Sequence, residues 1–263
     1  MLVSVVIPAH NEADGITPTV TALHDTLAAA GIDHEIVVVD DHSSDRTAAV
    51  VTGLAERIAE VRMVQNHASG GFGMAVRRGL EAFRGDAVAI YMADASDSPE
   101  DLVMFIRTME VRGTDCVFGS RFAPGGEVHD YPRLKLLLNR VANTGIRVLF
   151  GLRYDDMTNA FKLYRREVIE GVSPLLSHHF NLTVEIPLKA VVRGYSFAVV
   201  PNSWTNRAHG TSKFQIQEMG SRYAFIVLYC FLERWLSRGD YHRRVDEAAA
   251  REAAAVAPED GRD

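Results

Sequence analysis

Lysine and cysteine are scarce in this chain of 263 residues. Arginine outnumbers lysine by 24 to 4, and Cys116 and Cys230 are the two cysteines. Cysteines so far apart have no metal-ligand spacing and form no disulfide framework, so we expect reduced thiols and a cytoplasmic protein. The net charge of −6 argues against a general nucleic-acid binder, and we expect no nucleic-acid partner.

Long apolar runs are missing as well. The longest uncharged candidate, residues 223–232, has ten residues, whereas a membrane-spanning helix needs about 20. No basic region precedes Pro8, so a signal peptide is not expected. Hydrophobic residues at 47% and charged residues at 24% are typical of a soluble globular protein, and the length suits one compact domain.

Short β-branched runs alternate with helical patterns in the first half of the chain. Leu23 and Leu27, for example, continue a helical spacing that Gly31 ends. The runs expected to form strands are 3–7, 35–39, 61–64, 87–92 and 115–118. This alternation predicts an α/β fold in which helices cover both faces of a mostly parallel sheet, with a Rossmann-like nucleotide-binding half.

The second half is richer in helical patterns. Amphipathic or apolar spacing predicts helices within 134–149, 184–192 and 216–236, and a further strand at 197–200. From Gly239 the chain is rich in Ala, Glu and Arg, which predicts a frayed or disordered tail. The predicted domains are one catalytic domain over 1–236, with a nucleotide-sugar half (1–122) and an acceptor half ending in a helix (123–236), followed by the tail (237–263).

Polar residues follow four of the predicted strands, at 8–12, 40–44, 94–97 and 119–121. Ligands of parallel sheets bind beyond the carboxyl ends of the strands, so these segments are the candidate site. Asp94, with Ser96 or Asp97, offers the hard oxygen ligands that Mg²⁺ or Mn²⁺ prefers. One of Asp97 and Ser98 is expected to cap the helix that begins near Pro99.

Two glycine-rich or basic loops complete the candidates. Residues 70–73 contain three glycines but no Gly-Lys-Ser/Thr sequence, so they predict a tight turn before a helix. Residues 207–213 combine Arg207, Lys213 and hydroxyl side chains. Cations on such a loop are suited to neutralising the charge of a departing diphosphate.

The segments Val5–Glu12 and Val37–Thr47 resemble the opening of the family-2 glycosyltransferases, which have the GT-A fold. The tripeptide Gly119-Ser120-Arg121 and the loop 207–213 are similar to those of the dolichyl- and polyprenyl-phosphate sugar synthases, the dolichol-phosphate mannosyltransferase type. The resemblance covers roughly residues 3–236. It departs from the family at Met92-Ala93-Asp94, where the first carboxylate of the Asp-x-Asp motif is absent.

This resemblance implies roles for individual residues. The nucleotide-sugar contacts would be Pro8, Ala9, His10, Glu12, Val39, Asp41, Ala93, Asp94, Arg207 and Lys213. The catalytic residues would be Asp94, Arg121, Lys135 and Arg207. A Mg²⁺ or Mn²⁺ ion would be held by Asp94 and Ser96. Arg121 would face the donor sugar or the acceptor phosphate, and Lys135 would lie near that phosphate.

The expected reaction moves a hexosyl group from a nucleotide diphosphate sugar to a polyprenyl phosphate, with inversion. One alternative is a family-2 transferase acting on a saccharide or other hydroxyl, which would need a base such as Asp97. Others are a nucleotidyltransferase and a non-catalytic nucleotide-sugar-binding protein. A lipid acceptor implies peripheral contact with the cytoplasmic face of a membrane, for which 223–235 is the candidate; packing in a homo-oligomer is the other interpretation of that segment.

Overall fold

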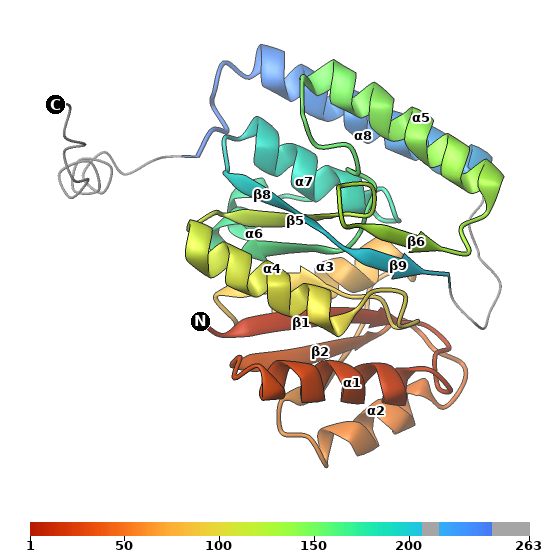
Figure 1. Cartoon of the computed structure of the whole chain (residues 1–263). Coiled ribbons are helices and arrows are strands. Elements are labelled where there is room, and N and C mark those ends of the chain that lie inside the picture. Colours follow the sequence, from red (N-terminus) through yellow and green to blue (C-terminus); the bar gives the residue numbers. More distant parts are fainter. Residues whose placement is uncertain (207–215, 244–263) are drawn as a thin grey trace, which may run out of the picture.

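The computed structural model describes residues 1–206 and 216–243 and is built around a seven-stranded sheet (Figure 1). In spatial order the strands are β3 (Val61–Gln65), β2 (His34–Asp40), β1 (Val3–Ala9), β4 (Ala87–Ile90), β7 (Lys162–Arg165), β5 (Cys116–Ser120) and β8 (Phe197–Pro201). Only β7 runs antiparallel, between β4 and β5. The prediction of a mostly parallel sheet is therefore confirmed.

Valine-rich strands fit this sheet because both of its faces are covered. Val5 and Ile7 of β1 point into one apolar core, whereas Val6 between them points into the other. The helices over the first core are α1 (Ile16–Ala29), α2 (Thr47–Ala55) and α4 (Pro99–Arg112). Those over the second core are α3 (Phe72–Ala82), α6 (Arg166–Val172) and α7 (Leu182–Val192). Burial on both faces explains the near-continuous hydrophobic strands.

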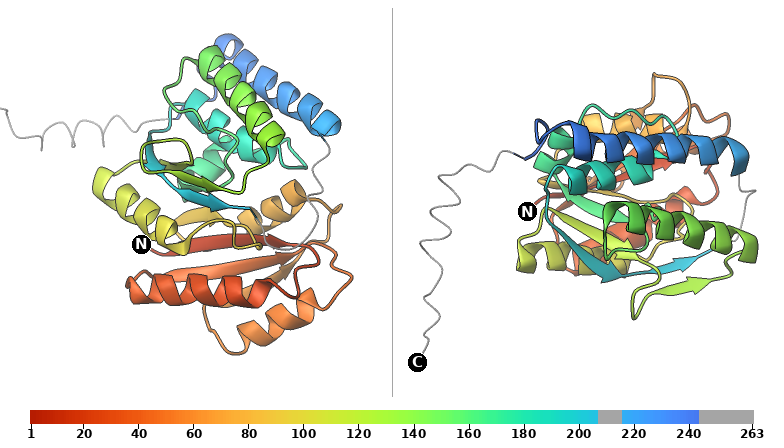
Figure 2. Two further views of the ribbon diagram at one scale, coloured as in Figure 1. Left: turned by 45° about the vertical axis from the view of Figure 1, so that its right-hand side comes forward. Right: turned by 90° about the horizontal axis from the view of Figure 1, so that it is seen from above.

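Two long helices, α5 (Arg133–Phe150) and α8 (Ile216–Leu236), form a further layer beyond α7 (Figures 1 and 2). The Phe150 and Phe231 rings pack edge to face at 6.1 Å, and Arg234 donates to the Phe150 carbonyl oxygen at 2.6 Å. Arg193, which follows α7, forms a buried ion pair with Glu233 of α8 at 2.7 Å. These contacts hold both helices against the second core.

Local signals set the ends of α4. The Ser98 hydroxyl accepts a hydrogen bond from the Glu100 amide, Pro99 occupies the first turn, and Gly113 ends the helix with φ +62°. Ser98 is thus the predicted cap. The two-stranded sheet of β6 (Glu127–His129) and β9 (Ser203–Thr205) was not expected from the sequence, and neither was α6.

Cys116 and Cys230 are both buried free thiols. Within residues 1–206 and 216–243, no helix has the length and apolar character needed to cross a bilayer. Most of the predicted tail, residues 244–263, lies outside the described part of the chain.

Candidate active site

Three neighbouring strands, β2, β1 and β4, bring most of the predicted nucleotide-sugar residues to one edge of the sheet. The residues at or just beyond the carboxyl ends of these strands are Pro8, Ala9, His10, Glu12, Val39, Asp41, Ala93 and Asp94. The loop after β1 contacts the loop after β2 directly, since His10 Nδ1 lies 2.6 Å from the Asp41 carbonyl oxygen. The sequence-based grouping of these residues therefore matches their placement.

The loop after β1 is fixed to the loop after β2. Asn11 adopts φ +56°, and its side-chain oxygen accepts a hydrogen bond from the Ser44 amide at 2.8 Å. The Glu12 amide donates to the Thr47 hydroxyl at 2.9 Å. A positive φ suits Asn, whose short polar side chain tolerates this backbone conformation. The two loops thus form one preorganised rim.

Asp41 supports a third loop through its carboxylate. Its two oxygens accept hydrogen bonds from the Asn66 side chain at 2.7 Å and from the Gly71 amide at 2.8 Å. Gly71 has φ +139° and directly precedes α3, which confirms the tight turn predicted at residues 70–73. The contact with Asn66 was not predicted from the sequence. Asp41, a predicted nucleotide-sugar contact, therefore also holds the loop before α3 in place.

The segment after β4 carries the predicted metal ligands. The Asp94 carboxylate accepts a hydrogen bond from the Ser96 amide at 3.2 Å, and Ala95 between them has φ +53°. Asp97 is 4% exposed, and its Oδ1 has no hydrogen-bond partner among the described residues. Burial, together with the nearby Asp94 carboxylate, raises the pKa of Asp97 to about 8. The buried carboxyl of Asp97 therefore favours its protonated form more than an exposed carboxyl does.

Asp94 and Ser96 fit a hard divalent cation. Mg²⁺ and Mn²⁺ commonly take one or two carboxylates and complete their coordination with substrate phosphates and water. The short turn brings one carboxylate and one hydroxyl-bearing residue together at the strand end, next to the predicted nucleotide rim. The described residues contain no cluster of three or more His, Cys, Asp or Glu side chains that could hold a metal ion. A cation at Asp94 and Ser96 would therefore need oxygen ligands from the substrate or water.

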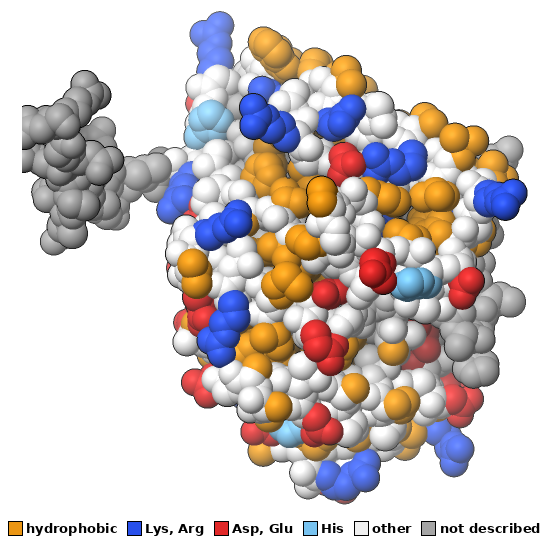
Figure 3. Space-filling view, in the orientation of Figure 1, with side chains coloured by type: hydrophobic (Ala, Val, Ile, Leu, Met, Phe, Trp, Pro, Cys, Tyr) orange, Lys and Arg blue, Asp and Glu red, His pale blue; other side chains and the backbone are white. Residues whose placement is uncertain are grey.

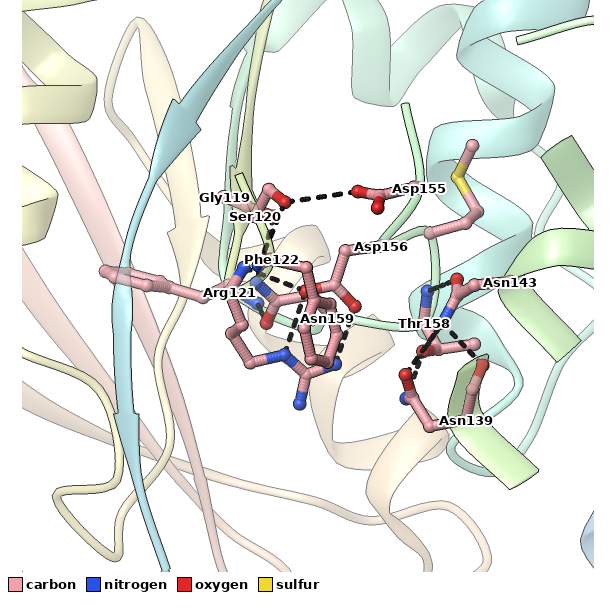
Figure 4. Close-up of polar contacts among 12 residues, drawn as sticks. Gly119, Ser120, Arg121, Phe122, Asn139, Asn143, Asp155, Asp156, Thr158 and Asn159 are labelled. Atoms are coloured by element: carbon pink, nitrogen blue, oxygen red, sulfur yellow. Dashed lines mark hydrogen bonds and ion pairs between the residues drawn. The ribbon is translucent and has the colours of Figure 1, made fainter. Parts of the chain in front are cut away.

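Arg121 follows β5 and forms a buried, bidentate ion pair with Asp156 (Figure 4). Its Nε and Nη2 donate to the two carboxylate oxygens at 2.9 and 2.7 Å, and its backbone amide donates at 3.0 Å. Arg121 is 7% exposed and Asp156 is fully buried. Arg121 was predicted as a site residue, whereas its pairing with Asp156 was not, although a carboxylate is the usual partner of a buried arginine.

The segment that carries Asp156 is itself tightly held. The Tyr154 hydroxyl lies 2.6 Å from the Asp156 carbonyl oxygen and 2.8 Å from the Gly119 carbonyl oxygen, so its single proton is shared between them. The Asn159 side chain donates to the Gly119 oxygen at 2.9 Å. Lys162 of β7 is fully buried and donates to the carbonyl oxygens of Met157 and Asn159. Burial lowers the pKa of Lys162 to about 7. These bonds fix the position of the Arg121 guanidinium.

Lys135 lies on α5, where its ammonium is 5.6 Å from the centre of the Tyr131 ring and 5.9 Å from that of Trp204. Asp97 is close enough to both Asp94 and Arg121 for their charges to affect its pKa: the Asp94 carboxylate raises it and the Arg121 guanidinium lowers it. The predicted contacts Arg207 and Lys213 lie outside the described residues.

Comparisons with known proteins identify the family of the chain. The sequence model of glycosyl transferase family 2 matches residues 4–172. Polyprenol monophosphomannose synthase of Mycolicibacterium smegmatis is 32% identical over 83% of this chain and 86% of its own length. Dolichol-phosphate mannosyltransferase of Pyrococcus furiosus is 33% identical over 82% of this chain, which spans 60% of that relative.

Solved structures share the fold. Glucosyl-3-phosphoglycerate synthase from Mycobacterium tuberculosis superposes with a TM-score of 0.65 at 20% identity, over 88% of this chain and 79% of that one. The same enzyme has been crystallised with Mn²⁺, uridine diphosphate and phosphoglyceric acid. The predicted GT-A fold is confirmed, and the chain belongs to glycosyl transferase family 2.

Proposed function

We propose that this glycosyltransferase moves a sugar from a nucleotide diphosphate sugar to a polyprenyl phosphate. One observation carries the proposal: the strand ends of β2, β1, β4 and β5 gather Asp41, Asp94 and Arg121 at one edge of the sheet. Support for the acceptor comes from the names of the two relatives, a polyprenol monophosphomannose synthase and a dolichol-phosphate mannosyltransferase.

The chemistry requires charge control more than proton transfer. The acceptor phosphate is already anionic, so its oxygen attacks the anomeric carbon while the bond to the nucleoside diphosphate breaks, inverting that carbon. A divalent cation held by Asp94 and Ser96 would offset the charge on the departing diphosphate. Support for the cation comes from glucosyl-3-phosphoglycerate synthase, which shares the fold and has been crystallised with uridine diphosphate and Mn²⁺ or Mg²⁺.

Arg121 and Lys135 are the basic residues placed to steer the acceptor phosphate. Asp156 fixes two of the Arg121 nitrogens, so the guanidinium keeps one orientation without reorganising during the reaction. A hydroxyl acceptor would need a base. The nearest candidate, Asp97, is 4% exposed, which favours an acceptor that has no proton to lose.

A transfer assay tests this function. The protein is incubated with labelled GDP-sugars and UDP-sugars, Mn²⁺ and liposomes that contain a polyprenyl phosphate. We expect label in the lipid extract, and we expect Asp94→Asn to reduce it at least 100-fold. Asp25→Asn, an exposed position on α1, is the matched control and should leave activity unchanged. Transfer to soluble saccharides alone, or no turnover with any donor, would refute the proposal.

Helices α5 and α8 carry an exposed apolar surface that suits the membrane contact a polyprenyl acceptor requires. The exposed apolar residues there are Leu134, Leu137, Leu138, Val141, Val148 and Leu149 of α5, and Phe225, Leu228, Leu232, Trp235 and Leu236 of α8. Hydrophobic side chains with basic ones between them gather over this part of the molecule (Figure 3). Such a mixture is typical of helices that lie in a membrane interface.

This surface refines the membrane contact proposed for residues 223–235. Phe225 and Trp235 are 61% and 67% exposed, whereas Tyr223, Tyr229 and Phe231 are half-buried. We expect Phe225→Asp and Trp235→Asp each to weaken co-sedimentation with liposomes several-fold. Val111→Asp, on α4 and 86% exposed, is the control. Unchanged sedimentation of both α8 variants would remove the membrane contact.

A further inference from the structure

Positively charged side chains alternate with aromatic rings beside the proposed acceptor position. In spatial order the row consists of Arg140, Phe122, Arg121, Tyr131, Lys135 and Trp204. Each cation in the row lies 4.3 to 5.9 Å from the centre of a neighbouring ring. At such distances the negative face of an aromatic ring attracts a cation, so the row is held together by charge as well as by packing.

Lys135 lies at the end of this row, against two rings. Its ammonium is 5.6 Å from the centre of the Tyr131 ring and 5.9 Å from that of Trp204, and the two rings are themselves 4.9 Å apart. All three side chains are half-buried. A lysine side chain is long and flexible, and its ammonium would otherwise occupy many positions. Contact with both rings restricts the ammonium to a small region.

The Tyr131 ring contacts both of the cations assigned to the acceptor phosphate. The Arg121 Cζ atom is 5.8 Å from the ring centre, and the Lys135 ammonium is 5.6 Å from it. Attraction to one ring offsets part of the repulsion between the two positive groups. A phosphate monoester carries close to two negative charges at neutral pH, so two cations beside one ring match its charge.

The strand that carries Trp204 is fixed to the segment with the predicted metal ligands. Trp204 forms a β-bridge with Asp97, and the amide of the following residue donates to the Ser96 carbonyl oxygen at 3.0 Å. The Asp101 carboxylate of α4 accepts hydrogen bonds from the Ser203 amide and hydroxyl at 2.8 and 2.9 Å. The backbone of Trp204 is thus tied to the donor side of the site, whereas its ring contacts Lys135 on the acceptor side.

We propose that Tyr131 and Trp204 are positioning residues that hold the Lys135 ammonium at the acceptor phosphate. The proposal rests on the proposed function, in which Lys135 steers that phosphate. In-line attack requires the acceptor oxygen to lie at a set distance from the sugar carried by the donor. Because Trp204 contacts both Lys135 and the segment after β4, it sets the position of the acceptor cation relative to the donor site.

Replacement of Trp204 by a series of increasingly fluorinated tryptophans separates attraction from packing. Fluorine withdraws electron density from the face of the ring and weakens its attraction for a cation, while the shape of the ring changes little. Binding of farnesyl phosphate is measured by calorimetry, without a donor. We expect the Kd to rise with each added fluorine, reaching about tenfold, at an unchanged melting temperature. An affinity that does not depend on fluorination would overturn the proposal.

Kinetics of ordinary variants give a second, independent measurement. We expect Trp204→Leu to raise the KM for polyprenyl phosphate about tenfold and to leave the KM for the nucleotide sugar unchanged, and Trp204→Phe to restore most of the loss. Tyr195→Leu is the matched control, because it removes a ring 5.7 Å from the Arg243 Cζ atom at the opposite edge of the sheet, before β8. Equal impairment of Trp204→Phe and Trp204→Leu, or an equal rise in both KM values, would contradict the positioning role.

Failure of the proposal and failure of the proposed function give different results. A natural chain that binds farnesyl phosphate with the expected dependence on fluorination, yet transfers no sugar to polyprenyl phosphate, would refute the function and leave the positioning of Lys135 intact. Sugar transfer with an acceptor KM that is insensitive to fluorination would refute the positioning and leave the function intact. A natural chain that does not bind farnesyl phosphate would overturn the positioning as well.

Discussion

Arg121 and Asp156 form a buried ion pair, and each residue is compatible with a stable fold only because the other is present. Asp156 is fully buried and makes three bonds to Arg121, two of them to the guanidinium. Burying a single charge is far more costly than burying a matched pair. The energetic importance of Asp156 therefore lies in leaving no uncompensated guanidinium in the interior.

Replacing one member of the pair should destabilise the protein strongly. We expect Asp156→Ala to lower the free energy of unfolding by about 3–5 kcal/mol, measured by urea denaturation. The matched control is Asp155→Ala, whose carboxylate pairs at 3.0 Å with the half-exposed Arg140; we expect a loss of about 1 kcal/mol or less. Similar losses in the two variants would contradict the assigned role of the buried pair.

Lys162 predicts a pH dependence of stability. Its pKa is about 7 in the folded protein, below its unfolded value near 10.5. Between these two pH values the unfolded chain binds a proton that the folded chain does not, so the contribution of Lys162 makes stability rise with pH in this window. Lys162→Met removes this contribution.

The measurement is the free energy of unfolding at several pH values from 6 to 10. We expect the stability of the natural chain to increase, relative to that of Lys162→Met, as the pH rises from about 7 towards 10. A constant difference between the two proteins across that range would show that the folded pKa of Lys162 is not lowered.

Single residues differed in how well the sequence predicted them. The cap of α4 was predicted to be Asp97 or Ser98, because capping depends on neighbours in sequence, and Ser98 fills that role. Asp156 and Asn66 were missed because their partners, Arg121 and Asp41, lie 35 and 25 residues away. A pairing across that distance depends on how the strands are ordered in the sheet.

Helix α3 is packed so closely on the segment before α7 that its first turn requires glycine. A methyl group on Gly73 would lie 2.4 Å from the His178 carbonyl carbon, and backbone atoms cannot retreat as easily as a flexible side chain can. The glycine at this position therefore allows the start of α3 to pack directly on the backbone of the segment before α7.

We expect Gly73→Ala to destabilise the protein by about 1–3 kcal/mol, as is usual for overpacking, and to lower its melting temperature. Gly53→Ala in α2 is the control, because nothing lies within 4 Å of the added carbon there. It should stabilise the protein by about 0.5–1 kcal/mol through helix propensity. Stabilisation of both variants would show that the approach of α3 to His178 is looser.

Elements differed in predictability for a physical reason. The helices and the buried strands of the first half have long, regular apolar patterns, and their sequence-based ranges are close to the observed ones. β6 and β9 have three residues each, which is too short for a pattern to show. β7 runs antiparallel to both β4 and β5, and its four residues do not encode that direction.

At the scale of the whole molecule, one sheet separates two apolar cores. Its strands contribute side chains to both cores, so neither core persists when the sheet is lost. This supports the proposal that residues 1–236 form a single domain whose two halves fold together.

The prediction is one cooperative unfolding transition. Phe105→Ala of α4 and Leu188→Ala of α7 remove buried side chains from the two different cores, each at a cost of about 2–5 kcal/mol. In both variants, far-UV circular dichroism and tryptophan fluorescence should give the same, lower midpoint. Val111→Ala, at an 86% exposed position, is the control. Separate transitions for the two probes would indicate two independent domains.

Because β7 lies between β4 and β5 but follows both in sequence, the sheet cannot be completed until β7 has been synthesised. When residue 122 has just been synthesised, β4 and β5 exist as sequence, yet the strand that joins them is still to come. Open strand edges are templates for aggregation. Until residues 162–165 follow, β4 and β5 therefore lack the strand that pairs with both of them, and an excised nucleotide-binding half (residues 1–122) would lack that strand altogether.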